Sequence, residues 1–230
     1  MATMRPIPYP TSRPAYFNLF ARLEAKGEWI GSTQPGAFRS LFGASVCDMD
    51  WTEALTHVEA ASSQRQGARS LSFIDGQTAL RLSVDKDCRA VLGKRILLPA
   101  SRVLALTVRL QGDGPLKASF EAAGFVDALL TFMSRRHVAL VGADLSRLKA
   151  TQARLAQHAP WHVFSIVRAA DLGSGIAVNG SISGPVSSAP DMVIVDACGY
   201  DEELRFEEAL SLRHNGLIVM AGGAFSERNS

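Results

Sequence analysis

Cysteine and histidine are sparse in this sequence, and their spacing excludes two common kinds of site. The three cysteines lie far apart and form no Cys-x-x-Cys pair. His158 and His162 are four residues apart, but Pro160 between them disfavours the continuous helix that would bring both rings onto one metal ion. We therefore expect neither a disulfide framework nor a metal site.

Long apolar runs and an excess of one charge are also missing. No run reaches the roughly 18–20 apolar residues that a membrane-spanning helix needs, and the proline-rich start lacks the apolar core of a signal peptide. Twenty-four Lys and Arg residues stand against twenty-two Asp and Glu, for a net charge of +2, which is too balanced to attract nucleic acid. These absences predict a cytoplasmic protein without a nucleic-acid partner.

Two glycine signatures for phosphate binding are absent as well. The sequence contains neither Gly-x-Gly-x-x-Gly nor Gly-x-x-x-x-Gly-Lys-Ser/Thr. The first pattern marks the standard dinucleotide-binding turn and the second marks the P-loop. A nucleotide, if one binds, must be held by other means.

Residues 1–45 are expected to form an N-terminal arm outside the main domain. The opening stretch, MATMRPIPYPTSRPAY, is rich in proline and should be irregular. The next stretch, YFNLFARLEAKGEWI, places its aromatic and leucine side chains on one helical face. Such a helix would pack on the domain or, because arginines and lysines accompany it, lie on an anionic membrane surface or a partner.

Residues 46–230 alternate between strand and helix patterns. The runs HVALV, DMVIV and LIVMA have no polar alternation, which is typical of strands that are buried on both faces. Strands that alternate with helices form βαβ units. The sequence predicts an α/β domain with a Rossmann-like parallel sheet and helices on both faces. Expected helices cover residues 51–61, 76–93, 120–136, 146–158 and 201–212, expected strands cover 68–75, 94–101, 137–144, 161–167, 191–197 and 216–223, and 102–110 fits either.

Ligands of such sheets bind at the carboxyl ends of the strands. Three turns at expected strand ends contain glycine, at residues 142–144, 196–199 and 222–224. A helix that starts at such a turn presents backbone N–H groups and a positive dipole end, which suit a phosphate. The Gly/Ser-rich segment 173–188 is too long for a simple connection and is expected to form a loop over a site.

Three consecutive acids, Asp201, Glu202 and Glu203, open the helix expected after DMVIV. Carboxylates in a first helical turn are stabilised by the helix dipole by about 0.3–1 kcal/mol each, which is a sufficient structural explanation. The same acids could instead bind sugar hydroxyls or orient an attacking hydroxyl. The pattern alone leaves both interpretations open.

A longer segment adds a resemblance to a known family. HVALVGADLSRLKATQARLAQHAPWHVF, PDMVIVDACGYDEELRF and GLIVMAGGAF are similar to successive strand and helix segments of the WecG/TagA/CpsF glycosyltransferases, glycosyltransferase family 26. SFIDGQTALRLSVDKDCRAVLGKRILLPAS resembles an earlier region of that family more loosely. The resemblance covers roughly residues 46–227 and is specific in its last third.

The resemblance implies a reaction and its participants. Members of this family transfer a sugar from a nucleotide-sugar, here expected to be a UDP-sugar, to a polyprenyl-diphosphate-linked acceptor in bacterial surface polysaccharide (exopolysaccharide) biosynthesis. The transfer is a direct displacement with inversion, and it implies no metal and no cofactor beyond the donor substrate. It also implies a peripheral position at the inner face of the cytoplasmic membrane. Polysaccharide-synthesis proteins or further copies of the chain are the implied protein partners.

The family register suggests site residues. Glu203 falls on the family's Glu and Glu202 on its Gln, so these two acids are the catalytic candidates. The expected substrate-binding residues are Gly142, Ala143, Asp144, Gly199, Tyr200, Gly222 and Gly223.

The chain departs from the family pattern at important positions. Ala100 stands where the family has the Asp that serves as candidate general base, and Phe73 stands near the family's Thr. The chain also stops at Ser230, where family members continue into a basic appendage. Either another carboxylate, Glu121, Asp144 or Glu203, replaces the missing acid, or the protein is a catalytically impaired relative that acts as a binding partner or regulator.

A third reading belongs to another enzyme class. The segment from residue 191 to 223 also resembles the acidic strand, helix and Gly-Gly strand of S-adenosylmethionine-dependent methyltransferases. HVALVGAD, however, lacks the Gly-x-Gly turn that lets this cofactor approach the first strand. We therefore keep the methyltransferase as a further alternative.

Overall fold

The computed structural model of the chain describes residues 38–63, 67–100, 115–169, 172, 189–197 and 199–225. These residues belong to a compact unit that covers Gly36–Ser230. Most of the expected N-terminal arm, the segment 102–110, the Gly/Ser-rich segment 173–188 and Cys198 lie outside the described residues. Within the described ranges, no helix is long and apolar enough to cross a membrane.

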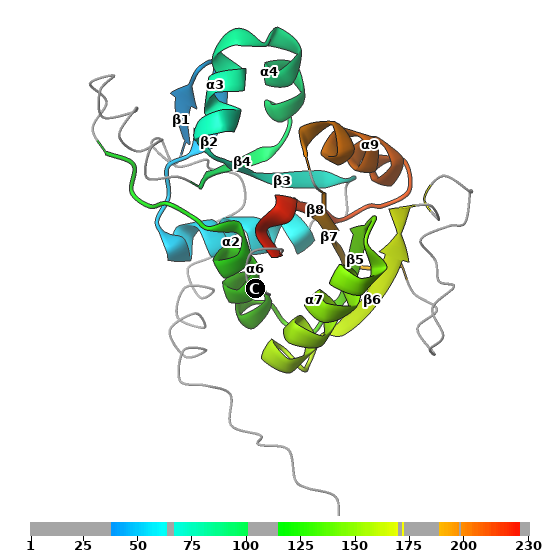
Figure 1. Cartoon of the computed structure of the whole chain (residues 1–230). Coiled ribbons are helices and arrows are strands. Elements are labelled where there is room, and N and C mark those ends of the chain that lie inside the picture. The colour runs from blue at the N-terminus through cyan, green and yellow to red at the C-terminus, as the bar shows by residue number, and fades with distance from the viewer. Residues whose placement is uncertain are drawn as a thin grey trace, which may run out of the picture. The chain divides into compact units, whose positions relative to one another are not determined.

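Six strands of the described residues form one parallel sheet. They are β3 (Arg69–Ile74), β4 (Ile96–Pro99), β5 (His137–Gly142), β6 (Val163–Arg168), β7 (Met192–Asp196) and β8 (Leu217–Met220). Their order is β4-β3-β8-β7-β5-β6, and every neighbouring pair is parallel (Figure 1). The runs HVALV, DMVIV and LIVMA are the neighbours β5, β7 and β8, which confirms the predicted Rossmann-like α/β fold.

Alternate residues of the central strands enter two different cores, which explains why these strands have no polar alternation. In β5, Val138 and Leu140 belong to the core on one face, whereas Ala139 and Val141 belong to the core on the other. β7 and β8 alternate in the same way. Both faces of the sheet are therefore covered, as a parallel sheet requires.

Helices cover the two faces (Figure 1). They are α2 (Trp51–Ser63), α3 (Gly76–Val84), α4 (Lys86–Leu92), α6 (Ala122–Phe132), α7 (Leu145–His158) and α9 (Tyr200–Ser211). α2, α6 and α7 pack into the core on one face. On the opposite face, α9 packs over β5, β7 and β8, and α3 and α4 pack over β3 and β4.

Aspartates begin several of these helices. At α2, the Glu53 N–H donates to Asp50 Oδ1 at 2.8 Å and the Asp50 N–H donates to Glu53 Oε2 at 2.9 Å, which is a capping box. Asp85 divides the helix that we expected over residues 76–93. Its N–H donates to Arg81 O at the end of α3, and its carboxylate accepts from the Cys88 N–H at the start of α4.

A β-hairpin that the sequence did not predict precedes α2. Its strands, β1 (Phe38–Leu41) and β2 (Ala44–Cys47), pair antiparallel and extend across the expected domain boundary between residues 45 and 46. The turn residues Phe42 and Gly43 both have positive φ, 51° and 80°, as a two-residue hairpin turn requires. Asparagine or aspartate usually precedes the glycine of such a turn, so Phe-Gly gave no signal.

The chain order places early and late strands side by side. From β3 the chain passes outward to β4, continues at β5 and passes outward to β6. It then returns through β7 and β8, which fill the space between β5 and β3. The carboxyl ends of β3, β8 and β7 are therefore adjacent, with the starts of α3 and α9 beside them.

Candidate active site

A cavity of about 500 Å³ lies at the carboxyl ends of β3, β7 and β8. Its size is within the range of about 300–1,000 Å³ that is usual for small-molecule sites, and its position follows the rule for parallel sheets. It is lined by Ser72, Phe73, Ile74, Asp75, Gln77, Thr78, Arg81, Leu92, Ala197, Gly199, Tyr200, Glu203 and Gly222.

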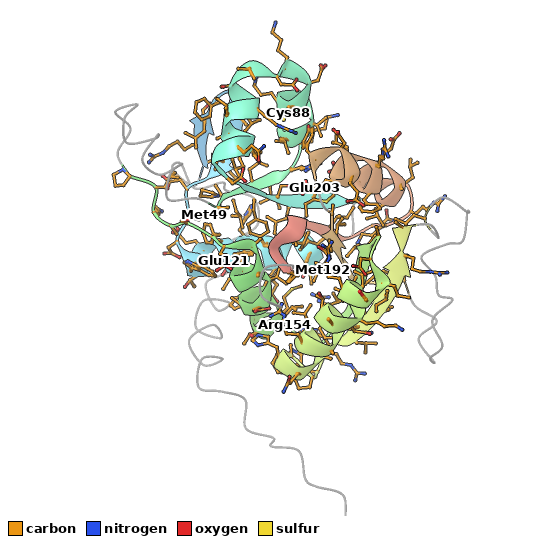
Figure 2. The ribbon with its side chains drawn as sticks, viewed as in Figure 1. Met49, Cys88, Glu121, Arg154, Met192 and Glu203 are labelled. Carbon is orange, nitrogen blue, oxygen red and sulfur yellow. The ribbon has the colours of Figure 1, made fainter. Side chains whose placement is uncertain are left out.

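Glu203 is a largely buried carboxylate in this cavity. It lies in the first turn of α9 (Figure 2), and its side chain is 18% exposed. Burial raises its pKa, Arg95 lowers it, and the carboxylates of Glu207 and Asp75 raise it. A carboxylate with a raised pKa is a stronger base than an ordinary exposed carboxylate.

Gly222 lies near Oε1 of the Glu203 carboxylate. It follows β8 and begins the 3-10 turn η1 (Gly222–Phe225), where Gly223 comes next. Its φ of 57° is in the left-handed region that favours glycine. A Cβ at this position would lie 3.7 Å from Glu203 Oε1, at van der Waals contact distance.

Below Glu203, Arg95 is completely buried and joins three polar side chains. Arg95 Nε donates to both carboxylate oxygens of Glu207, at 3.1 and 3.0 Å. Its Nη1 donates to Ser72 Oγ at 2.9 Å and lies 3.5 Å from Glu203 Oε2. The three partners come from β3 and α9, so the guanidinium joins the strand to the helix beneath the cavity.

Arg81 and Tyr200 face each other across the cavity from α3 and α9. The guanidinium carbon of Arg81 lies 5.5 Å from the centre of the Tyr200 ring, which is a cation–π distance. Burial, followed by a hydrogen bond with Cys88, raises the pKa of Tyr200. Its hydroxyl therefore remains protonated, while Arg81 supplies positive charge to the cavity.

Asp75, which the sequence analysis did not select, also lines the cavity. It follows β3 and caps α3, where its Oδ1 accepts from the Thr78 N–H at 2.7 Å. The turn Asp75-Gly76 after SLSFI carries the same signal as the three glycine turns at the other strand ends. Extending the strand-end rule to every expected strand would have found this acid, although not the buried Arg95.

The predicted site is only partly assembled. Gly199, Tyr200, Glu203 and Gly222 meet at the cavity. Among the described residues that line it, Glu202 and the turn at 142–144 are not present. The predicted grouping of that turn with the other glycines around one cleft is therefore not what the structure shows.

The turn at 142–144 has a structural explanation. A Cβ on Gly142 would come within 2.9 Å of the Asp196 carbonyl oxygen and 3.2 Å of Leu148 Cδ2, so glycine permits close packing of β5 against β7 and α7. Ala143 follows as an exposed residue. Asp144 caps α7 and accepts from the Ser146 N–H at 2.8 Å, and the hydrogen bond from the Ser146 hydroxyl is the main cause that lowers its pKa.

A buried ion pair lies beneath this turn. Asp196 is 3% exposed and lies 2.6 Å from Arg147 Nε. Burial raises the pKa of Asp196, and Arg147 opposes the rise. The pair joins the end of β7 to α7 and is not among the residues that line the cavity.

The two departures from the family pattern have clear positions. The Ala100 N–H donates to Ile74 O at 2.7 Å, which extends the pairing of β4 with β3. The Phe73 ring packs edge-on against Phe125 in the core, with the ring centres 5.8 Å apart. Of the three replacement acids, only Glu203 lines the cavity within the described part of the chain; Glu121 precedes α6 and is exposed.

The described residues contain no group of three or more His, Cys, Asp or Glu side chains that could hold a metal ion. No protein-family profile matches the chain, and no curated protein matches it in sequence. The cavity is therefore the feature that indicates the function.

Proposed function

We propose that the cavity binds a nucleotide-sugar and that the protein is a glycosyltransferase of the WecG/TagA/CpsF type. The acceptor would be a polyprenyl-diphosphate-linked sugar, which would bring the protein to the inner face of the cytoplasmic membrane. The observation that carries the proposal is the Glu203 carboxylate. It is buried in a cavity at the strand ends, and its pKa is raised.

In this proposal Glu203 is the general base that replaces the acid absent at Ala100. Its Oε1 takes the proton of the acceptor hydroxyl while that oxygen attacks the anomeric carbon. The bond from the anomeric carbon to the nucleoside diphosphate breaks, and its electron pair leaves with the diphosphate. Arg81 and the N–H groups at the start of α9 would bind the diphosphate charge.

A second candidate, the catalytically impaired relative, is favoured by a separate observation. Neither Ala100 nor Phe73 supplies a titratable group, and Phe73 is packed into the core. The cavity could then bind a nucleotide-sugar without transferring it. The methyltransferase has less support, because the turn at 142–144 is not among the described residues that line the cavity.

Ligand binding is tested by thermal unfolding with UDP, UDP-sugars and S-adenosylmethionine. A ligand at about 100 times its Kd adds roughly 2.7 kcal/mol to the unfolding free energy, which raises the Tm by roughly 5–10 °C in a protein of this size. We expect the shift with UDP or a UDP-sugar. A shift with S-adenosylmethionine alone would contradict the proposal.

Transfer is tested with a polyprenyl-diphosphate-linked acceptor and the variant Glu203→Gln. Loss of a general base lowers the rate by roughly 10²–10⁴-fold, so we expect a loss of that size with donor binding retained. Glu208→Gln removes an exposed acid from the same helix and serves as the matched control. Donor binding without transfer by the wild type would favour the impaired relative.

A further inference from the structure

The Arg95 guanidinium beneath the cavity pairs with two carboxylates, and it contacts one of them much more closely than the other. Arg95 directs Nε and Nη2 at Glu207, with contacts of 3.1, 3.0 and 2.5 Å. It offers Glu203 a single longer contact of 3.5 Å from Nη1. The guanidinium is a planar fork that binds one carboxylate at two points. Glu207 is therefore the main counter-ion of Arg95, and Glu203 is a secondary partner.

This division leaves the two oxygens of Glu203 in different surroundings. Oε2 is on the Arg95 side, and Oε1 is on the Gly222 side, 3.7 Å from where a Cβ of that residue would be. Ser72 accepts from the same Nη1 at 2.9 Å and helps to fix the guanidinium. Glu203 thus has one oxygen in contact with Arg95 and one on the Gly222 side of the cavity.

Charged groups surround Glu203 from each neighbouring element. Arg95 precedes β4, Glu207 is on α9, and Asp75 caps α3. Arg81 lines the same cavity from α3, with its guanidinium over the Tyr200 ring. Of these groups, only Arg95 both contacts the Glu203 carboxylate and is itself held by two further side chains.

We propose that Arg95, held by Glu207 and Ser72, is the positioning residue that anchors Glu203 Oε2 and presents Oε1 to the hydroxyl of the sugar acceptor. This inference rests on the proposed function of the cavity. During transfer the proton passes from the acceptor hydroxyl to Glu203 Oε1, and Arg95 keeps its own protons. Glu207 holds the guanidinium in place and limits how strongly it pairs with Glu203.

Two substitutions should change the titration of Glu203 in opposite directions. Glu207→Gln removes a negative charge near Glu203 and leaves Arg95 with one carboxylate, so the midpoint should move to lower pH. Arg95→Gln removes the positive charge, so the midpoint should move to higher pH. Glu208→Gln is the control on the same helix and should leave the midpoint unchanged.

The midpoint is measured by NMR of protein labelled with ¹³C at the glutamate side-chain carboxyl carbon. The Glu203 signal is assigned as the one that Glu203→Gln removes. The pH at half-maximal sugar transfer is measured in parallel and should move with the NMR midpoint in each variant. If Arg95→Gln does not fold, because it leaves Glu207 buried without its partner, Glu207→Gln still gives the test.

The outcomes separate this inference from the function on which it rests. A folded Glu207→Gln protein whose Glu203 midpoint equals that of the wild type would overturn the role of Arg95, whatever the transfer rate. A purely structural role would lower the Tm and leave the midpoint in place. Opposite shifts in a protein that transfers no sugar would support the Arg95–Glu203 coupling and overturn the proposed glycosyltransferase.

Discussion

The substitution Gly142→Ala tests whether Gly142 is needed for packing or for ligand binding. Gly142 lies in β5 and is not among the glycines with positive φ, so its backbone conformation does not require glycine. The added Cβ would come within 2.9 Å of the Asp196 carbonyl oxygen and 3.2 Å of Leu148 Cδ2. The Leu148 side chain can rotate, but the carbonyl oxygen belongs to the next strand and can move only with the sheet.

The magnitude follows from two opposing contributions. Overpacking of a tight core costs about 1–3 kcal/mol, whereas replacing glycine by alanine restricts the unfolded chain and returns about 0.4–1 kcal/mol. The two ranges leave a net loss in unfolding free energy of roughly 0–2.6 kcal/mol, centred on about 1.3 kcal/mol, and the central value lowers the Tm by roughly 3–5 °C. Denaturant unfolding followed by circular dichroism measures it.

Gly199→Ala is the matched control. Gly199 lines the cavity, its backbone is extended, and a Cβ there would meet no atom within 4 Å. We expect its unfolding free energy to stay within about 0.5 kcal/mol of the wild type. If Gly142→Ala kept full stability and lost UDP-sugar binding, the packing explanation would be wrong and Gly142 would belong to the ligand site.

Three further substitutions test the remaining assignments. Asp144→Ala should cost about 0.5–2 kcal/mol through loss of the α7 cap and should leave UDP-sugar affinity unchanged; a loss of affinity would return Asp144 to the ligand site. Burial lowers the pKa of His162, whose Nδ1 accepts from a backbone N–H at 3.0 Å. The neutral His162 ring therefore contributes fully to the unfolding free energy above its ordinary pKa. This contribution is lost as the pH falls through the lower pKa of the folded state. Wild-type stability should fall more steeply below pH ~6.5 than that of His162→Gln, and equal slopes would refute this. Ala100→Asp should raise sugar transfer if the acid at that position still reaches the acceptor, and an unchanged rate would leave Glu203 as the base.

The sheet could be predicted because its strands are buried on both faces. The runs that became β5, β7 and β8 contain no polar alternation, and a parallel sheet between two helical layers buries such strands on both faces. Helix ends were less predictable. Asp85 ends α3 with its backbone N–H and starts α4 with its carboxylate, so one residue divides a segment whose helical periodicity continues across it.

The sequence could predict only those residues of the candidate site that come directly after an expected strand. Gly199 and Gly222 follow the neighbouring strands β7 and β8, so the strand-end rule brings them together. Gly142 also ends a strand, but β7 separates β5 from β8, and the cavity uses β3 instead. Periodicity identifies strands and does not give their order, so the sequence could not show which glycine turns share a cavity.

Local sequence patterns could not predict the contact between Arg95 and Glu203. Arg95 is separated from Glu203 by 108 residues and from Glu207 by 112. In the sequence, Arg95 is one basic residue before an apolar strand, and Glu207 is one of several acids on an amphipathic helix. Their pairing requires that β4 lie beside β3 and that α9 pack near β3. The order of the strands in the sheet decides both. Arg95 contacts Glu207 through Nε and Nη2 and contacts Glu203 only through Nη1, so in the proposed function Glu207 keeps the cation in place while Glu203 serves as the base.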